Sequence, residues 1–413
     1  IAFFEKMDTL EARLEEFLIP KENVTNLKEG QFILPGFVDT HIHASQYPNA
    51  GKGLDLQLLD WLDKYTFPTE ARYKNLTFAG NAYDTVVDRV IHNGTTTACY
   101  FATIHTDATL LLCDIIHKTG QRALVGKVNM NRNSPDFYRE DTEKSVKETE
   151  RYIECVLEKK YSLITPVITP RFSISCDSKL LNQLGDMAKK YKVPIQTHIS
   201  ENKKEVELVH TLFPESKNYI DTYHTAGLIT NRTVLAHGIY LSSEELSLIK
   251  AMGTSLSHCP NSNISIKSGL LDVRQLLDMG IKVGLGTDVS GGYSHSMLDA
   301  IRSAIHVSKI LGIQNGDSYR EIGHKEAFMM ATLGGSEALG LEDKVGNFVV
   351  GKEFDALLID VEAVGSPLDV FKEDTLEDVV EKFMYRGDDR NIVAVFVAGR
   401  IVCDKRRPGS AVE

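Results

Sequence analysis

Residues 34–43 have the sequence LPGFVDTHIH, a short apolar segment that ends in two histidines. Apolar and β-branched residues in a run of this length are typical of a buried parallel strand, and we expect one strand over Phe32–His41. Side chains at positions i and i+2 of a strand point to the same face. The imidazoles of His41 and His43 can therefore converge on one metal ion.

Similar apolar segments alternate with longer helix-like stretches along most of the chain. The further predicted strands are Thr95–Phe101, Arg122–Met130, Leu163–Pro170, Pro194–Ile199, Val234–Gly238, Thr254–His258 and Lys282–Thr287. Predicted helices between them include Ser145–Lys159, Asp177–Tyr191, Ser242–Met252 and Met297–Leu311. Eight strand–helix units in succession favour an α/β protein with a (β/α)8 TIM barrel. An open, doubly wound sheet is the alternative, because periodicity does not show whether a sheet closes.

Local signals mark several helix ends. Ser242 and Glu245 form a plausible capping box, with Ser242 as the N-cap. Gly120, Gly253 and Gly280 stand where helix C-terminal signals are expected.

The alternating pattern changes after about residue 341. Phe354–Asp360 has the composition of a strand, and the segments Ile392–Val397 and Arg400–Cys403 flank Ala398-Gly399, which is a hairpin signal. We expect a small, discontinuous β-sandwich domain that also includes the start of the chain. The predicted division is residues 1–33 in the small domain, 34–340 in the barrel and 341–413 in the small domain again.

Composition limits the function classes. The 413 residues are 42% hydrophobic and 25% charged, as in an ordinary globular protein, and the net charge is −11. An acidic chain does not attract nucleic acid or anionic membranes by its overall field, so we expect neither as a partner. The six cysteines are scattered, with no C-x-x-C pair, which favours reduced thiols and the cytosol. No signal peptide or transmembrane run is visible.

Three more potential metal-site residues stand at the ends of predicted strands. His198, His237 and Asp288 end the fifth, sixth and eighth strands, and in a barrel these ends share one rim with His41 and His43. We assign His41, His43, His198 and Asp288 to one metal ion, with His237 close by. Three histidines and a carboxylate suit Zn²⁺, and Fe²⁺ is a competitor.

Glu201 follows His198 by three residues, on the loop after the fifth strand. It is not needed as a metal ligand, so its carboxyl group is free to move protons. Adding water to an aromatic ring carbon requires a proton on the neighbouring ring nitrogen, and expelling an amine requires another. We therefore assign general acid–base catalysis to Glu201, with His237 and Asp288 as further catalytic residues.

These motifs resemble those of a known family. The segment LPGFVDTHIH resembles the opening motif of the amidohydrolase superfamily, and the H-x-x-E of His198 and Glu201 resembles its mononuclear aminohydrolase branch. Binuclear relatives carry a bridging lysine at the end of the fourth strand, where this chain has Thr169-Pro170-Arg171. The resemblance therefore implies one metal ion per subunit.

Further stretches resemble the members of this branch that act on guanine. They are His41–Asn49, Asn93–Thr106, Thr169–Cys176, His198–Asn202, His258–Asn263, Gly284–Tyr293 and Gly334–Asp355. The resemblance implies hydrolytic deamination of guanine to xanthine and ammonia, a cytosolic homodimer and a role in purine catabolism. It also implies zinc on the four assigned ligands. The substrate contacts that it implies are His43, Ala44, Ser45, Gln46, Arg171, Phe172, His198, Glu201 and Asp288.

Guanine has two acceptors, O6 and N7, along one edge, and an arginine fork suits that edge. We expect Arg171 to contact it, with Phe172 giving an apolar or stacking contact and Gln46 an amide contact. Adenine has a donor in place of O6, so such a site would reject adenine.

Other functions remain open from the sequence. The nearest is an aminohydrolase of the same branch that acts on an adenine derivative, a pterin or a triazine. A non-catalytic scaffold on this fold, as in the collapsin response mediator family, is a second alternative. A sugar-phosphate or amide hydrolase of the barrel type is a third.

Overall fold

Parallel pairing joins the barrel strands in the order in which they occur along the chain. In the computed structural model, which describes residues 10–406, they form two arcs, β2-β3-β4-β6 and β8-β9-β10-β11. Short segments β5 and β7 continue β4 and β6. The bounds are β2 (Phe37–His43), β3 (Thr95–Phe101), β4 (Arg122–Gly126), β5 (Val128–Asn129), β6 (Ile164–Pro166), β7 (Thr169–Pro170), β8 (Ile195–Ile199), β9 (Thr233–His237), β10 (Ser255–His258) and β11 (Val283–Leu285).

Backbone hydrogen bonds close the two arcs into a ring. On one side the amide of Asp288 donates to His41 O at 2.8 Å and that of His43 donates to Val289 O at 3.0 Å. On the other side the amide of Gln196 donates to Ile168 O at 2.9 Å. The predicted TIM barrel is therefore confirmed, and the open sheet is excluded.

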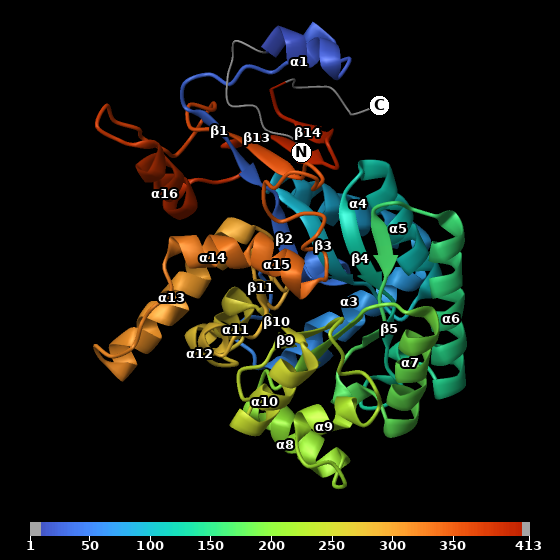
Figure 1. The fold of residues 1–413 in the computed structure, drawn as a ribbon. Coiled ribbons are helices and arrows are strands. Elements are labelled where there is room, and N and C mark those ends of the chain that lie inside the picture. Colours follow the sequence, from blue (N-terminus) through green and yellow to red (C-terminus); the bar gives the residue numbers. More distant parts are fainter. Residues whose placement is uncertain (1–9, 407–413) are drawn as a thin grey trace.

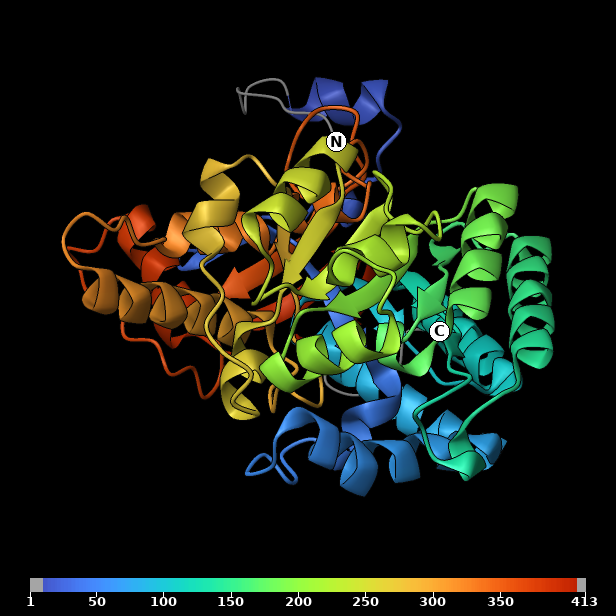
Figure 2. The ribbon, with the colours of Figure 1, turned by 90° about the horizontal axis from the view of Figure 1, so that it is seen from below.

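Helices surround the barrel (Figures 1 and 2), with orange α13 on one side and green α6 and α7 on the other. The longer helices are α4 (Leu76–His92), α5 (Thr106–Thr119), α6 (Thr142–Lys159), α7 (Ser178–Tyr191), α8 (Lys203–Leu212), α10 (Ser243–Met252), α13 (Met297–Asn315) and α16 (Leu376–Arg386). Shorter helices are α1 (Leu10–Glu16), α2 (Leu58–Trp61), α3 (Phe67–Ala71), α9 (Tyr219–His224), α11 (Pro260–Ser265), α12 (Val273–Asp278), α14 (His324–Met330) and α15 (Leu333–Ala338).

The predicted helix-end signals hold at α5 and α10, and Gly280, which is also left-handed, directly follows the C-cap residue of α12 (Val273–Asp278). Ser242 caps α10, and the reciprocal bond from Glu245 completes the capping box. Gly120 and Gly253 end α5 and α10 in the left-handed conformation that glycine adopts without steric cost.

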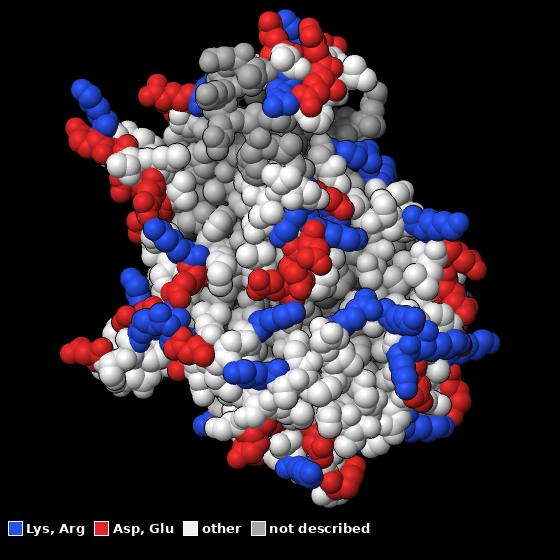
Figure 3. Space-filling model, in the orientation of Figure 1, with Lys and Arg blue, Asp and Glu red and all other residues white. Residues whose placement is uncertain are grey.

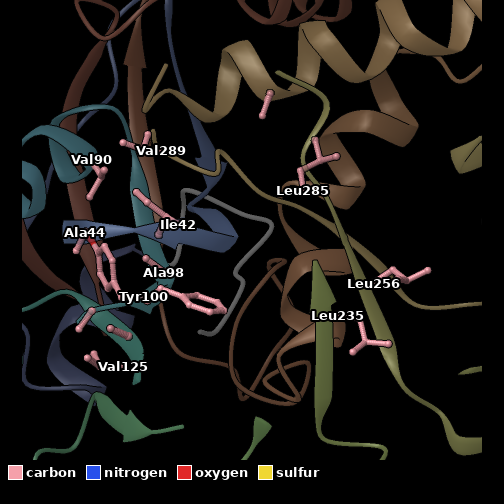
Figure 4. Close-up of a cluster of buried hydrophobic side chains, with 14 of the residues drawn as sticks. Ile42, Ala44, Val90, Ala98, Tyr100, Val125, Leu235, Leu256, Leu285 and Val289 are labelled. Atoms are coloured by element: carbon pink, nitrogen blue, oxygen red, sulfur yellow. The ribbon is translucent and has the colours of Figure 1, made fainter. Parts of the chain in front are cut away.

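Apolar side chains from the barrel strands fill its wall and the layer beneath the helices. Figure 4 shows Ile42 of β2, Tyr100 of β3 and Leu235 of β9 in this buried cluster. Each of these three side chains is completely shielded from solvent. Their burial accounts for the nearly continuous apolar runs by which the strands were predicted.

A four-stranded antiparallel sheet lies at one end of the barrel, in the order β1-β12-β13-β14. Figure 1 shows blue β1 (Gln31–Pro35) at the same end of the molecule as β13 (Ile392–Val397) and β14 (Arg400–Asp404), which come from the other end of the sequence. The remaining strand, β12 (Ala356–Asp360), pairs with β1 and β13. A discontinuous small β domain is thus confirmed, but its described strands form one antiparallel sheet and not the two packed sheets of the predicted sandwich. Residues 1–9 and 407–413, which the sequence also assigned to it, lie outside the described residues.

The prediction of a single strand over Phe32–His41 is wrong. The chain breaks at Gly36: β1 pairs with the small sheet, and β2 begins at Phe37 in the barrel. A Cβ atom at Gly36 would lie 2.2 Å from Thr96 Oγ1 and 2.3 Å from its Cγ2, so only glycine lets the turn pass over β3.

Replacing Gly36 with alanine is expected to lower the free energy of unfolding by about 1–3 kcal/mol, because the new methyl group overlaps the buried Thr96 side chain. Urea denaturation would measure the loss. Gly80→Ala in α4 is the control, since its Cβ would meet only Leu111 Cδ2 at 3.6 Å and alanine favours a helix. A Gly36→Ala protein as stable as Gly80→Ala would contradict the explanation.

The surface carries both charges in small groups. On the face shown in Figure 3, basic and acidic side chains alternate. All six cysteines are free thiols. Within residues 10–406, no helix has the length and apolar character needed to cross a membrane.

Candidate active site

The four predicted metal ligands lie together at one rim of the barrel. His41 and His43 end β2, His198 lies on β8 and Asp288 follows β11. One donor atom from each side chain lies within 4.8 Å of the other three. His43 Nε2 and His198 Nε2 are 3.1 Å apart, and Asp288 Oδ1 is 3.2 Å from His41 Nε2. All four side chains are buried.

The protonation states of these groups fit a divalent cation. Burial lowers the pKa of His41, and it lowers those of His43 and His198 well below the usual value, so the imidazoles are neutral. Burial alone would raise the pKa of Asp288, but the facing His41 and His237 rings hold it below its usual value. Neutral imidazoles and an ionised carboxylate are the forms in which these side chains bind metals.

His198 is oriented by a hydrogen bond at the far side of its ring. Its Nδ1 lies 2.6 Å from Arg171 O, so this nitrogen carries the proton and Nε2 has a free lone pair. A histidine ligand typically donates its other ring N–H to a carbonyl or carboxylate in this way. The hydrogen bond to Arg171 O therefore holds the His198 ring with its Nε2 directed at the metal position.

Asp39 supports the neighbouring backbone of the cluster. Its carboxylate accepts hydrogen bonds from the amides of His41 and Thr287 and, at 2.6 Å, from the Thr287 hydroxyl. It therefore ties the strand that carries His41 to the loop that carries Asp288. Burial raises the pKa of Asp39 to about 7. The three hydrogen bonds act to lower it, but burial has the larger effect.

Cys259 also lies near His41 and His237. Burial raises the pKa of its thiol well above the usual value. Because the thiolate is the form that binds metals, this cysteine is a poorer ligand than Asp288.

His237 differs from the other three histidines in its surroundings. Its Nδ1 donates to Asn263 Oδ1 at 2.8 Å, and its Nε2 lies 3.4 Å from Glu201 Oε2 and 3.6 Å from Asp288 Oδ2. Burial acts to lower the pKa of His237, but the two facing carboxylates more than offset it and raise the pKa. The ring thus links the carboxylate of Asp288 with that of Glu201.

Glu201 lies on the loop after β8, where it is 3% exposed. Its Oε1 accepts a hydrogen bond of 2.8 Å from the Ser268 hydroxyl. Burial raises the pKa of Glu201 to about 7, although the nearby His237 acts to lower it. A carboxyl group with such a pKa can both accept and donate a proton near neutral pH.

A pocket with about 380 Å³ of empty space, part of it open to solvent, lies beside the cluster. It is lined by His43, Gln46, Leu58, Trp61, Leu62, Arg171, Phe172, His198, Glu201, Ile266, Asp288 and Gly291. Seven of the nine predicted substrate contacts are among these residues. The other two, Ala44 and Ser45, are buried but do not line the pocket, and the Ser45 hydroxyl instead donates to Ala102 O at 2.8 Å.

The sequence did not indicate two groups of residues around this pocket. Leu58, Trp61 and Leu62 form part of its apolar wall, and they come from α2 and the π-helical turn η4 (Leu62–Thr66). Glu70 in α3 lies behind the pocket and is completely buried, bonded to Arg171 and Gln46. None of these residues belongs to a motif or stands at a strand end, so no local pattern could have identified them.

Known proteins with similar sequences belong to the class of enzyme that this site suggests. The model of the amidohydrolase family matches residues 32–402, so the chain belongs to the amidohydrolase family. Within the family it belongs with the guanine deaminases: it is 53% identical to the guanine deaminase of Homo sapiens over 97% of this chain and 89% of that protein.

Solved structures give the same grouping. A guanine deaminase from C. acetobutylicum with bound guanine in the active site is 40% identical and superposes with a TM-score of 0.87, covering 93% of this chain and 90% of that one. A triazine hydrolase from Arthobacter aurescens has a TM-score of 0.80, covering 92% of this chain and 85% of the other, but only 20% identity, so it shares the fold alone.

Proposed function

We propose that this protein is an enzyme that hydrolyses guanine to xanthine and ammonia, with one zinc ion held by His41, His43, His198 and Asp288. The observation that carries the proposal is the lining of one pocket. Three of the metal donors, the proton-transfer candidate Glu201 and the polar groups of Arg171 and Gln46 all border the same space. The similarity to guanine deaminases over nearly the whole chain supports guanine as the base.

Zinc suits a site with three imidazoles and a carboxylate, although iron fits the same donor set. Bound there, the cation would lower the pKa of a water molecule enough to make hydroxide available at neutral pH. The donor atoms of the chain that would hold it are those described above.

Glu201 moves the protons of the reaction. It takes a proton from the attacking water and delivers it to N3 of guanine while the C–O bond forms at C2. The new C2 hydroxyl then gives its proton to Glu201 or Asp288, which passes it to the amino group. The C2–N bond breaks, the C2=O bond of xanthine forms, and ammonia leaves. His237 bridges these two carboxyl groups, and together with the closer His41 it holds the pKa of Asp288 below its usual value.

Residues outside the metal cluster bind the base. Arg171 donates to the acceptors O6 and N7, Gln46 adds an amide contact, and Phe172 contacts the ring. Leu58, Trp61 and Leu62 add apolar surface, which excludes water from the reacting atoms. We further propose that the protein acts as a cytosolic homodimer in purine catabolism, as the family resemblance implies.

Incubating the purified protein with guanine, adenine, a pterin and a triazine is expected to release ammonia from guanine alone. The physical reason is that adenine places a donor where the arginine fork requires an acceptor, and a mismatch of this kind can cost about 10⁴-fold in specificity. Ammonia release and xanthine absorbance would both be followed. If adenine, the pterin or the triazine were turned over faster than guanine, that compound would replace guanine as the proposed substrate.

A further inference from the structure

Glu70 lies at the centre of a hydrogen-bond network behind the pocket. Its Oε2 accepts from Arg171 Nη1 at 2.7 Å and from the Tyr138 hydroxyl at 2.7 Å. Its Oε1 accepts from Gln46 Nε2 at 2.9 Å and from Arg171 Nη2 at 3.2 Å. Among the described residues, each carboxylate oxygen thus has two donors, and the side chain is completely buried.

The network joins segments that follow different barrel strands. Gln46 lies in η3 (Ala44–Asn49) after β2, Arg171 follows β7, and Tyr138 ends the short helix η6 (Asp136–Tyr138). Glu70 itself comes from α3, which also places the Phe67 ring 5.2 Å from the Arg171 guanidinium. One short helix therefore supplies both the counter-ion and an aromatic contact to the arginine.

The carboxylate fixes the orientation of both polar groups. Two of the five N–H donors of Arg171 are bonded to Glu70, which leaves the other donors of the fork available. The Gln46 amide is held at both ends, because its Nε2 donates to Glu70 and its Oε1 accepts from the Ser290 amide at 3.2 Å. Without Glu70, the Gln46 amide would lose one of the two contacts that set which atom faces the base.

The charge of Glu70 also matters for burial of the arginine. Burial acts to lower the pKa of Arg171, and the Glu70 carboxylate more than offsets it, so the pKa is raised. A buried guanidinium without a partner is strongly unfavourable, whereas a bidentate carboxylate pair is tolerated. The arginine can therefore present donors to a neutral base without carrying an uncompensated charge into the pocket.

We propose that Glu70 is a positioning residue that sets base specificity by orienting Arg171 and Gln46 toward the 6-oxo edge of the purine. This inference rests on the proposed function, since it assumes a purine base in the pocket. Glu70 does not line the pocket and touches no reacting atom.

The test compares binding of hypoxanthine and unsubstituted purine, which differ in the 6-oxo group and its accompanying ring proton and have no amino group to lose. Trp61 is the only tryptophan in the sequence and lines the pocket, so its fluorescence reports Kd directly. The variant is Glu70→Gln, which keeps the shape but loses the charge. Asp355→Asn is the matched control, because Asp355 forms a buried bidentate pair with Arg122, the first residue of β4, at the opposite end of the barrel strands from this network.

We expect Glu70→Gln to raise the Kd for hypoxanthine by about 10- to 100-fold while changing the Kd for purine far less. Asp355→Asn should keep the wild-type ratio of the two constants. For guanine, KM should rise more than kcat falls. Should Glu70→Gln fail to fold, Tyr138→Phe removes one donor from the carboxylate without breaking the ion pair, and a smaller shift in the same direction is expected.

A wild-type ratio of the two constants in Glu70→Gln, or in Tyr138→Phe if that variant is used, would overturn the inference and leave the proposed function intact. Equal weakening of both ligands would overturn it too, because that result describes a purely structural carboxylate. A wild-type protein that neither binds hypoxanthine nor converts guanine would overturn the proposed function, and this inference with it.

Discussion

Glu201→Gln is expected to reduce kcat for guanine by about 10²–10⁴-fold, with the fold and the metal content unchanged. Glutamine has nearly the same shape and can still accept the hydrogen bond from Ser268, but it cannot take a proton from water or return one to the base. The measurement is steady-state xanthine formation, together with thermal unfolding and metal analysis of the same sample.

Ser268→Ala is the control for this prediction. It removes only the hydrogen bond that orients the Glu201 carboxyl group, so its loss of activity should be much smaller. Turnover near the wild-type rate in Glu201→Gln would remove this residue from the mechanism. Loss of metal from that variant would instead show that the carboxylate supports the cation.

Removal of the metal with a chelator is expected to abolish guanine deamination, and addition of Zn²⁺ should restore it at one ion per chain. Water that is not bound to a metal has a pKa of about 15.7, so without the cation Glu201, with a pKa of about 7, would have to remove a proton from a far weaker acid. Activity and metal content would be followed through depletion and refilling, with Fe²⁺ in a parallel sample.

Depletion should also lower Tm, because a ligand that binds only the folded chain stabilises it. His210→Ala offers a control for histidine loss in general, since His210 lies on α8 and is not among the grouped donors. It should keep its metal and its activity, whereas His198→Ala should lose both. Full activity in protein shown to contain no metal would rule out the proposed chemistry.

The barrel and the metal cluster were predictable because both follow local rules. Buried parallel strands are apolar along their whole length, and this pattern located β3 at the residues later observed. The i, i+2 spacing of His41 and His43 indicates a shared face without knowledge of the fold. Once the strand ends are known, barrel geometry alone brings His198 and Asp288 to the same rim.

The features that were missed depend on contacts between distant segments. The apolar pattern continues through Gly36, so it does not predict that the strand breaks there. The break depends on the position of Thr96 and on the pairing of β1 with β12. Glu70 lies in a short helix with no motif. From the sequence alone, a glutamate at such a position is expected to be exposed to solvent. It contacts Gln46, Tyr138 and Arg171 only after folding brings the three segments that carry them to its carboxylate.

Three of the four proposed metal ligands come from the first barrel strand and from the loop after the last one, and His198 comes from the fifth strand. Hydrogen bonds between these two places, from the Asp288 amide to His41 O and from the His43 amide to Val289 O, close the ring. A nascent chain leaving the ribosome therefore carries its histidine pair long before the carboxylate that completes the set. We therefore expect the complete four-residue site to form only late in biosynthesis, after Asp288 has left the ribosome.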